Sequence, residues 1–173
     1  MPDVRFDKPH RLKNFDGTNF NYSAMGSYMV TFNTRNRNPV LSDIVCPDGN
    51  PENAQVRLSD IGTVLENYIL RIPDHYHNVS VDKYVIMPDH VHIILTFCDD
   101  NYSAEYNNSR LSKIVHALKK LVTNTLGFSI WQLDYYDCVS FSEKAYDAFI
   151  AYVHNNPAVW YIKDKAEPDI PRK

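Results

Sequence analysis

The sequence predicts an α+β fold: a ferredoxin-like antiparallel sheet with helices on one face, followed by one additional C-terminal helix. The order of the segments leads to this expectation, because strand-like and helix-like segments follow each other as β-α-β-β-α-β. The last helical segment then has to pack against the same core. No internal repeat or linker divides the chain, and its 173 residues suit a single domain over 1–173.

The first half of the chain is expected to contain one strand and one helix. Residues 29–34 have the composition of a strand, and a turn rich in Arg and Asn follows at 35–39. The polar residues 1–27 before this strand should be irregular. Between 56 and 73, apolar residues recur at the i, i+3, i+4, i+7 spacing of an amphipathic helix, which Pro73 should close.

The second half should supply the rest of the sheet. Residues 79–87 have the pattern of a strand, and a turn at 88–89 joins them to an apolar strand that continues to Phe97. Ser109 should cap the second helix, because an amphipathic apolar stripe begins directly after it. The short aromatic segment 131–139 is the expected fourth strand.

The last helix is expected to begin after Ser142, which is a favourable N-cap residue. Its apolar stripe consists of Tyr146, Phe149, Ile150 and Val153. Pro157 should end the helix because proline cannot continue the backbone hydrogen bonding. Residues 163–173 are expected to be a polar tail.

The composition indicates a reduced, cytoplasmic globular protein. Hydrophobic residues make up 44% of the chain and aromatic residues 13%, which is enough for a proper core. The N-terminus has no signal-peptide pattern, and no run of about 18 apolar residues could span a membrane. Cys46, Cys98 and Cys138 are too scattered to suggest a disulfide framework or a zinc site.

The charge pattern leaves room for a nucleic-acid partner. The net charge of −3 argues against one at first. However, no acidic residue lies between Asp16 and Asp43 or between Glu105 and Asp134. A basic face for DNA is therefore predicted from the cations of these two stretches, and a scattered solvated surface is the alternative. The predicted contacts are Arg35, Arg37, Lys113, Lys119 and Lys120.

A His-Val-His segment carries the strongest indication of chemistry. Residues i and i+2 of a strand point to the same side, so the imidazoles of His90 and His92 should lie next to each other while Val91 faces the opposite layer. Two neutral imidazoles at this separation can share one divalent cation. The alternative is a pair of surface histidines on a half-exposed strand.

Tyr152 and Asn156 are four residues apart in the last predicted helix, so they can point the same way. They lie off its apolar stripe. The amide oxygen of Asn156 is a reasonable third ligand beside two imidazoles. A tyrosine hydroxyl is a weak nucleophile until a base, a metal ion or a positive environment assists it. With 12 tyrosines in the chain, spacing alone does not select Tyr152, and His154 is expected on a different face of the helix.

Three segments, in this order, resemble those of single-tyrosine HUH transposases, specifically the REP-associated tyrosine transposase branch. They are Tyr-Val-Ile-Met-Pro-Asp-His-Val-His at 84–92, the aromatic segment 131–137, and Tyr-Val-His-Asn-Asn-Pro-Ala at 152–158. Thr31, Thr34 and the basic turn 35–37 fit the first strand of that branch. The similarity spans about residues 28–162, essentially the whole predicted core.

The resemblance implies a metal-dependent enzyme that cleaves and rejoins single-stranded or hairpin-flanked DNA, as in transposition and recombination. It makes His90 and His92 metal ligands, Asn156 the third ligand and Tyr152 the nucleophile, with a 5′-phosphotyrosyl product and a free 3′-hydroxyl. Family members use Mg²⁺ or Mn²⁺, although imidazole ligands would also suit zinc. Two positions depart from the family, which commonly has histidine and arginine where this chain has Cys138 and Phe141. The loss of a cation there is expected either to weaken phosphate contacts or to accompany a changed substrate.

Other functions stay open. The first is a domesticated DNA-hairpin-binding protein that does not cleave. The second is a phosphoesterase or nucleotide hydrolase. A histidine-triad hydrolase would need histidine at position 94, which holds Ile94. A two-histidine phosphodiesterase would need a second motif of the form His-x-Thr/Ser, and none exists. The other His-x-His, at 75–77, follows a proline turn and should face solvent. The third is a ferredoxin-like structural module. The DNA sequence recognised and the choice between a monomer and a homodimer also stay open.

Overall fold

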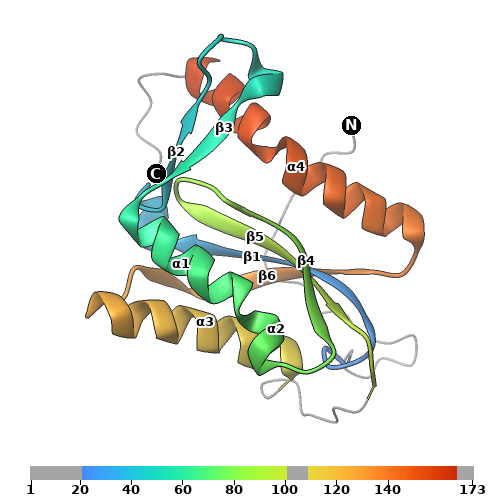
Figure 1. The fold of residues 1–173 in the computed structure, drawn as a ribbon. Coiled ribbons are helices and arrows are strands. Elements are labelled where there is room, and N and C mark those ends of the chain that lie inside the picture. Colours follow the sequence, from blue (N-terminus) through green and yellow to red (C-terminus); the bar gives the residue numbers. More distant parts are fainter. Residues whose placement is uncertain (1–20, 101–108, 167–173) are drawn as a thin grey trace.

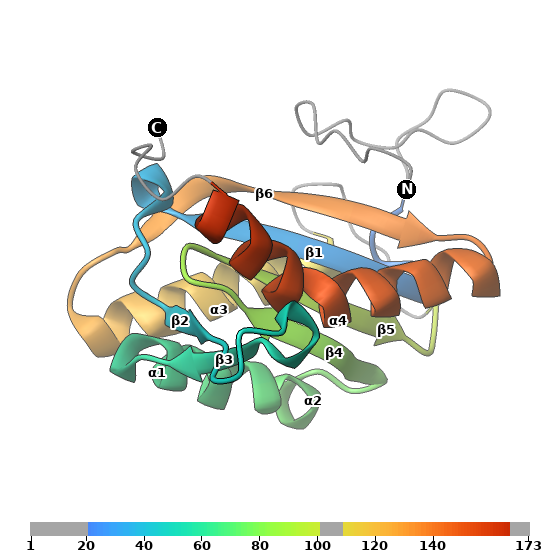
Figure 2. The same ribbon diagram turned by 90° about the horizontal axis from the view of Figure 1, so that it is seen from above.

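The computed structural model describes residues 21–100 and 109–166. Its centre is a four-stranded antiparallel sheet with the order β4-β5-β1-β6, which is the predicted ferredoxin-like arrangement (Figures 1 and 2). The strands are β1 (Gly26–Thr34), β4 (Val79–Ile86), β5 (His90–Phe97) and β6 (Trp131–Ser140).

Helices cover both faces of the sheet (Figure 2). On one face lie α1 (Asp60–Leu70), the short α2 (Ile72–His75) and α3 (Arg110–Leu126). On the other face lies α4 (Glu143–Ala166). The prediction of two long helices on one face and an additional C-terminal helix is therefore confirmed.

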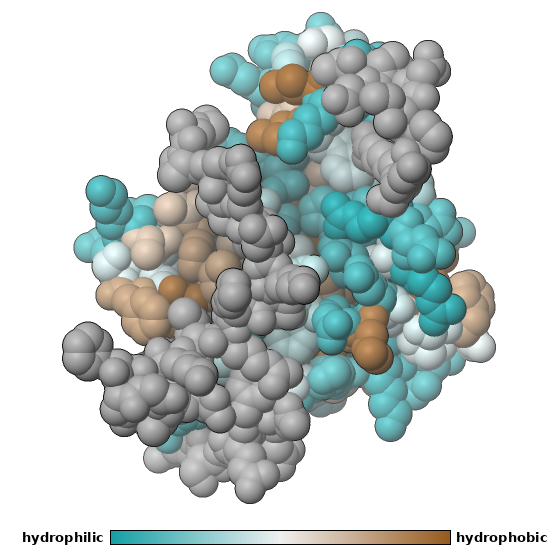
Figure 3. Space-filling model, turned by 180° about the vertical axis from the view of Figure 1, so that it is seen from behind, coloured by the Kyte–Doolittle hydropathy of each residue, from teal (hydrophilic) through white to brown (hydrophobic). Residues whose placement is uncertain are grey.

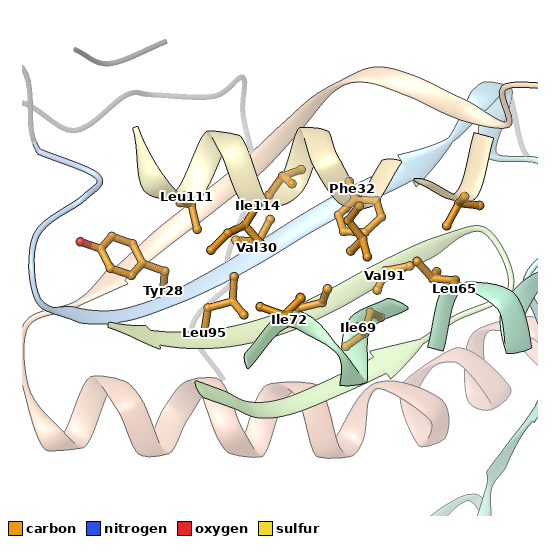
Figure 4. Packing of buried hydrophobic residues seen from close by; sticks show 14 of the residues in the cluster. Tyr28, Val30, Phe32, Leu65, Ile69, Ile72, Val91, Leu95, Leu111 and Ile114 are labelled. Carbon is orange, nitrogen blue, oxygen red and sulfur yellow. The ribbon is translucent and has the colours of Figure 1, made fainter. Parts of the chain in front are cut away.

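Strand alternation divides the apolar residues of β1 between two cores. Tyr28, Val30 and Phe32 point toward α1 and α3, where they join the larger core (Figure 4). Met29 points the other way, into a smaller cluster that includes Val153 of α4. The polar side chains that follow Met29 on the same face of β1 are consequently left beneath α4.

Both predicted serine caps are present. The Ser109 hydroxyl accepts a hydrogen bond from the backbone N–H of Ser112 at the start of α3 (3.2 Å). The Ser142 hydroxyl accepts one from Ala145 in the first turn of α4 (3.2 Å). α3 ends at Gly127, whose positive φ of 80° suits a left-handed C-cap.

The structure contains a hairpin that the sequence analysis missed. It consists of β2 (Ser42–Val45) and β3 (Gln55–Leu58), joined through the short helix η2 (Pro51–Asn53). It packs against the C-terminal part of α4 (Figure 1). The prediction of a helix from residue 56 was wrong at its start, because Ser59 caps α1 through Gly62 and the preceding residues are in β3.

Two prolines were wrongly predicted to close helices. Pro73 lies within the first turn of α2, where its missing N–H is tolerated. Pro157 is buried inside α4, which continues to Ala166. Proline removes one backbone hydrogen bond there, and burial of the apolar face of α4 against the sheet offsets that loss. The helix thus includes 163–166 of the predicted tail.

Other predicted boundaries also shift. β1 begins inside the segment 1–27 that was expected to be irregular, and residues 1–20 and 167–173 lie outside the described part of the chain. In the described ranges, no helix combines the length and apolarity needed to cross a bilayer. On the face seen from behind, apolar side chains gather in separate small patches among hydrophilic ones (Figure 3).

Candidate active site

His90 and His92 lie next to each other on the face of β5 that α4 covers. Their ring centroids are 4.8 Å apart and their planes are nearly perpendicular. Both are buried, with 7% and 2% of their surface exposed, whereas Val91 between them points into the larger core. The two histidines are therefore not a surface pair on a half-exposed strand.

The Nδ1 atom of each histidine is held by a neighbour. His90 Nδ1 donates to the carboxylate of Asp89 (2.6 Å), and His92 Nδ1 is 2.7 Å from the hydroxyl oxygen of Thr31, its cross-strand partner in β1. Because a carboxylate accepts the hydrogen bond, Asp89 keeps the proton of a neutral His90 on Nδ1 and leaves Nε2 with a lone pair. Such partners orient histidines that bind metal ions.

Asp89 is itself anchored from β1 and the turn after it. Its carboxylate is 2% exposed and pairs with Nε of Arg37 (3.1 Å). Another nitrogen of the same guanidinium donates to Asn33, the cross-strand partner of His90 (2.5 Å). The backbone carbonyl of Asp89 accepts from the backbone N–H of Thr34 (2.9 Å). Arg37 therefore fixes the carboxylate that orients His90.

His92 is buried and neutral. Within the described residues, its Nε2 atom is buried and has no hydrogen-bond partner. Burial lowers the pKa of His92 well below its ordinary value, and electrostatic interactions with His90 and with the cationic Arg37 lower it further. His92 is therefore neutral at neutral pH, which is the form that binds a metal ion.

α4 brings Tyr152 to this pair. The Tyr152 ring lies 5.1 Å from the His92 ring, centroid to centroid, and 36% of the residue is exposed. Eight residues further on, Trp160 lies 5.8 Å from the ring of His90. Asn156 is halfway between them, so helical spacing puts the three side chains on one face of α4. One chain thus supplies the histidines and the tyrosine.

The donor set fits a divalent ion that keeps open coordination positions. It would consist of two imidazole Nε2 atoms and the amide oxygen of Asn156. Across residues 21–100 and 109–166, no three His, Cys, Asp or Glu side chains gather where they could bind a metal. The orphaned, buried Nε2 of His92 is the observation that favours an ion here, since an unsatisfied buried nitrogen is unfavourable.

Four of the five predicted DNA contacts line one cavity. This basic cavity, of about 590 Å³, lies between the turn after β1, the C-terminal half of α3 and the start of β6. Its cations are Arg35, Arg37, Lys119 and Lys120, with His116 beside them. Lys113 is not among the lining residues.

Lys119 differs from the other cations of the basic cavity because it is buried. Its ammonium group donates to the backbone carbonyls of Gln132, Leu133 and Asp134, at 3.0, 3.3 and 2.9 Å. Only 7% of the residue is exposed, and burial lowers the pKa of Lys119 to about 8. These contacts give Lys119 a structural role at the start of β6, and its contact with DNA stays a prediction.

A matched pair of variants separates the two roles. Lys119→Ala should lower the free energy of unfolding by about 2 kcal/mol, because three carbonyls lose their donor. Lys120→Ala removes an exposed cation of the same cavity and should change stability by less than about 0.5 kcal/mol. Urea unfolding of both variants measures the difference. Equal stabilities would contradict the structural role of Lys119.

The remaining predicted positions divide between the two faces. Tyr136 pairs with Thr31 and lies on the α4 face, whereas Tyr135 packs toward α3, 6.2 Å from the His116 ring. Cys138 is half-buried beneath α4, and Phe141 is 72% exposed. His75 and His77 are exposed, as expected, and His154 is exposed as well.

The roles of three site residues were not predicted from the sequence. Asp89 was expected only as a turn residue, although an acidic residue directly before a histidine ligand is a signal for an orienting carboxylate. Trp160 lies beyond Pro157, where the helix was expected to have ended. Thr31 was matched to the family pattern without a role, and its alternation with Met29 in β1 could have placed it on the histidine face.

The chain was compared with known proteins and structures. No family model matches it. A Haemophilus influenzae protein described as uncharacterized is 26% identical over 170 residues, which cover 87% of this chain and 91% of that protein. A candidate transposase from Deinococcus radiodurans R1 aligns at 17% identity over 83% of this chain and 97% of its own, with a TM-score of 0.45.

The structure of a REP-associated tyrosine transposase bound to a REP hairpin matches with a TM-score of 0.54. The match covers 86% of this chain and 84% of that one, at 18% identity. The structural overlap shows a shared fold, and because the sequence identity is this low, the activity has to be argued from the site. The protein described here therefore has the fold of the REP-associated tyrosine transposase.

Proposed function

We propose that this protein cuts and rejoins single-stranded DNA next to a hairpin, with Tyr152 as the nucleophile, in the manner of a transposase. The observation that carries the proposal is the position of the Tyr152 ring, 5.1 Å from a buried, neutral histidine whose Nε2 has no partner among the described residues. Structural modules and pure DNA binders have no need for this combination. The fold shared with a transposase bound to a REP hairpin supports the choice of DNA as substrate.

His90, His92 and Asn156 would hold a divalent ion, Mg²⁺ or Mn²⁺. When bound, such an ion supplies positive charge that neutralises the scissile phosphate and a template for in-line attack. The chain's own contribution is orientation. Asp89 and Thr31 fix the two imidazoles through Nδ1, so that both Nε2 atoms are directed away from these partners.

The covalent step exchanges one phosphodiester for another. The Tyr152 hydroxyl gives its proton to water, its oxygen bonds to phosphorus, and the bond from phosphorus to the 3′-oxygen breaks. The leaving 3′-oxygen takes up a proton from water and becomes a free hydroxyl. Attack of a 3′-hydroxyl on the phosphotyrosine reverses these changes, so rejoining needs no nucleotide cofactor.

The basic cavity is the proposed path for the DNA backbone. Arg35 and Lys120 are exposed and unhindered by the contacts that engage Lys119, so they are the cations best placed to meet phosphates. Arg37 contributes less, because its guanidinium already holds Asp89 and Asn33. Contacts of this kind raise affinity for all sequences and weaken with salt.

The proposal is tested with hairpin oligonucleotides that carry randomised single-stranded flanks. In the presence of Mn²⁺, the protein should form an adduct that survives denaturing electrophoresis. A radioactive label should stay with the protein only when it lies 3′ of the cut, because tyrosine keeps the 5′-phosphate. Binding without any adduct across the library would instead favour the domesticated, non-cleaving DNA-hairpin-binding protein.

A further inference from the structure

We propose that a second cavity, beside His90, receives one unpaired base of the DNA strand and that the indole of Trp160 is its stacking surface. The inference rests on the proposed function for the identity of the ligand. It adds a residue and a site that the cleavage chemistry does not require.

The second cavity lies between the turn after β1, the β2 strand and the C-terminal part of α4. It has a volume of about 970 Å³, in the range of pockets that hold small organic ligands. Arg35 and Arg37 line one part of its wall, and Trp160 and Tyr161 line another. A cavity with guanidinium groups and aromatic rings in its wall suits a nucleotide, because phosphate and base each find a partner.

Trp160 connects this second cavity to the candidate active site. Its ring lies 5.8 Å from that of His90, and the residue is only half-buried, so the indole also lines the cavity. Trp160 follows Tyr152 by eight residues, or about 12 Å along the helix axis. A base on the indole would therefore lie within a few nucleotides of the phosphate that Tyr152 attacks.

The charges of the wall favour a base over a second phosphate. Besides the two arginines, the second cavity is lined by Asp43, by Asp164 and by Asp89, which is already paired with Arg37. Carboxylates repel phosphate and tolerate a neutral base. Because the basic cavity and the second cavity share the turn 35–37 and Ser129, one strand can follow the cations with its backbone and turn a base toward Trp160.

Stacking on an aromatic side chain and electrostatic binding to phosphates differ in how they respond to mutation and to salt. Removing such a side chain weakens single-strand binding about fivefold or more, whatever the base, because every base has a π-face. The salt dependence should stay the same, since no phosphate contact is lost. Loss of the base from the DNA should have the same effect as loss of the indole.

The test compares twelve-nucleotide oligo(dT) with an abasic chain of the same length, by fluorescence anisotropy in EDTA so that no metal ion contributes. The wild-type protein should prefer oligo(dT) by about tenfold. Trp160→Leu, which keeps an apolar side chain, should reduce this preference at least about fivefold, and Trp160→Tyr should largely retain it. Ile162→Ala is the matched control, because Ile162 is 53% exposed on the same helix and does not line the cavity.

Thermal unfolding checks that each variant is folded. An unchanged preference for oligo(dT) in folded Trp160→Leu would overturn the inference, and so would equal binding of both oligonucleotides by the wild-type protein. These outcomes are independent of the adduct assay. If the preference for oligo(dT) depends on Trp160 but no adduct forms, the stacking site is supported and the proposed cleavage is not. If adducts form but the preference does not depend on Trp160, the stacking site is contradicted.

Discussion

Tyr152→Phe is expected to bind the hairpin oligonucleotide as the wild-type protein does and to form no covalent adduct. Only the hydroxyl oxygen is lost, and this atom is the proposed nucleophile. The aromatic ring that contacts His92 remains, so the packing of α4 on the sheet should be preserved. Denaturing electrophoresis with Mn²⁺ measures the adduct, and anisotropy measures binding.

Two other tyrosines provide matched controls. Tyr136 lies on the same face of the sheet as His92, through its pairing with Thr31, and Tyr135 lies on the opposite face. Tyr136→Phe and Tyr135→Phe should both keep adduct formation. An adduct that persists in Tyr152→Phe and disappears in Tyr136→Phe would identify Tyr136 of β6 as the nucleophile and contradict the proposal.

Replacing His90 and His92 together with alanine should abolish Mn²⁺ binding measured by calorimetry. The larger core on the opposite face contains neither ring, so the double variant should keep the circular dichroism spectrum of the wild-type protein. Asp89→Asn gives a graded control. It leaves both ligands in place but weakens the contact that orients His90, and should reduce affinity roughly 10- to 100-fold.

The result that would contradict this metal site is unchanged Mn²⁺ affinity in the double variant. If only Asp89→Asn has unchanged Mn²⁺ affinity, His90 and His92 are still supported as ligands, but the carboxylate of Asp89 is not needed to orient His90. His75 and His77 form the other His-x-His segment and are exposed, so their double alanine variant should bind Mn²⁺ normally.

The sheet and its helices could be predicted because their signals are local. β5 and α3 carry long apolar patterns, and the structure confirms both elements. Ser109 and Ser142 are favourable N-cap residues, and the structure confirms both caps. The hairpin of β2 and β3 escaped detection because its strands have four residues each. Strands this short take their stability from the helix end on which they pack.

The end of α4 could not be predicted for a similar reason. Proline strongly disfavours a helix interior, and the rule fails at Pro157 because tertiary contacts hold the helix on both sides of it. Trp160 contacts His90 only because the helix continues. The position of the second cavity therefore depends on packing that no sequence pattern reveals.

The candidate site was more predictable than the basic face. Strand spacing correctly predicted that His90 and His92 lie next to each other. The family resemblance selected Tyr152, whose ring lies beside that of His92. Acid-free stretches indicated where cations are, but not which are exposed. Lys119 donates hydrogen bonds to backbone carbonyls, and Arg37 pairs with the carboxylate of Asp89. Only the three-dimensional structure distinguishes such residues from exposed surface charges.

Mass spectrometry of the protease-digested adduct tests the central claim most directly. After nuclease trimming, the peptide that contains Tyr152 should carry a nucleotide joined through its 5′-phosphate, and the released DNA should end in a 3′-hydroxyl. The same peptide from Tyr152→Phe should be unmodified. A nucleotide on another tyrosine, a 3′-phosphate linkage, or no modified peptide from wild-type protein incubated with Mn²⁺ and the hairpin library would contradict the account.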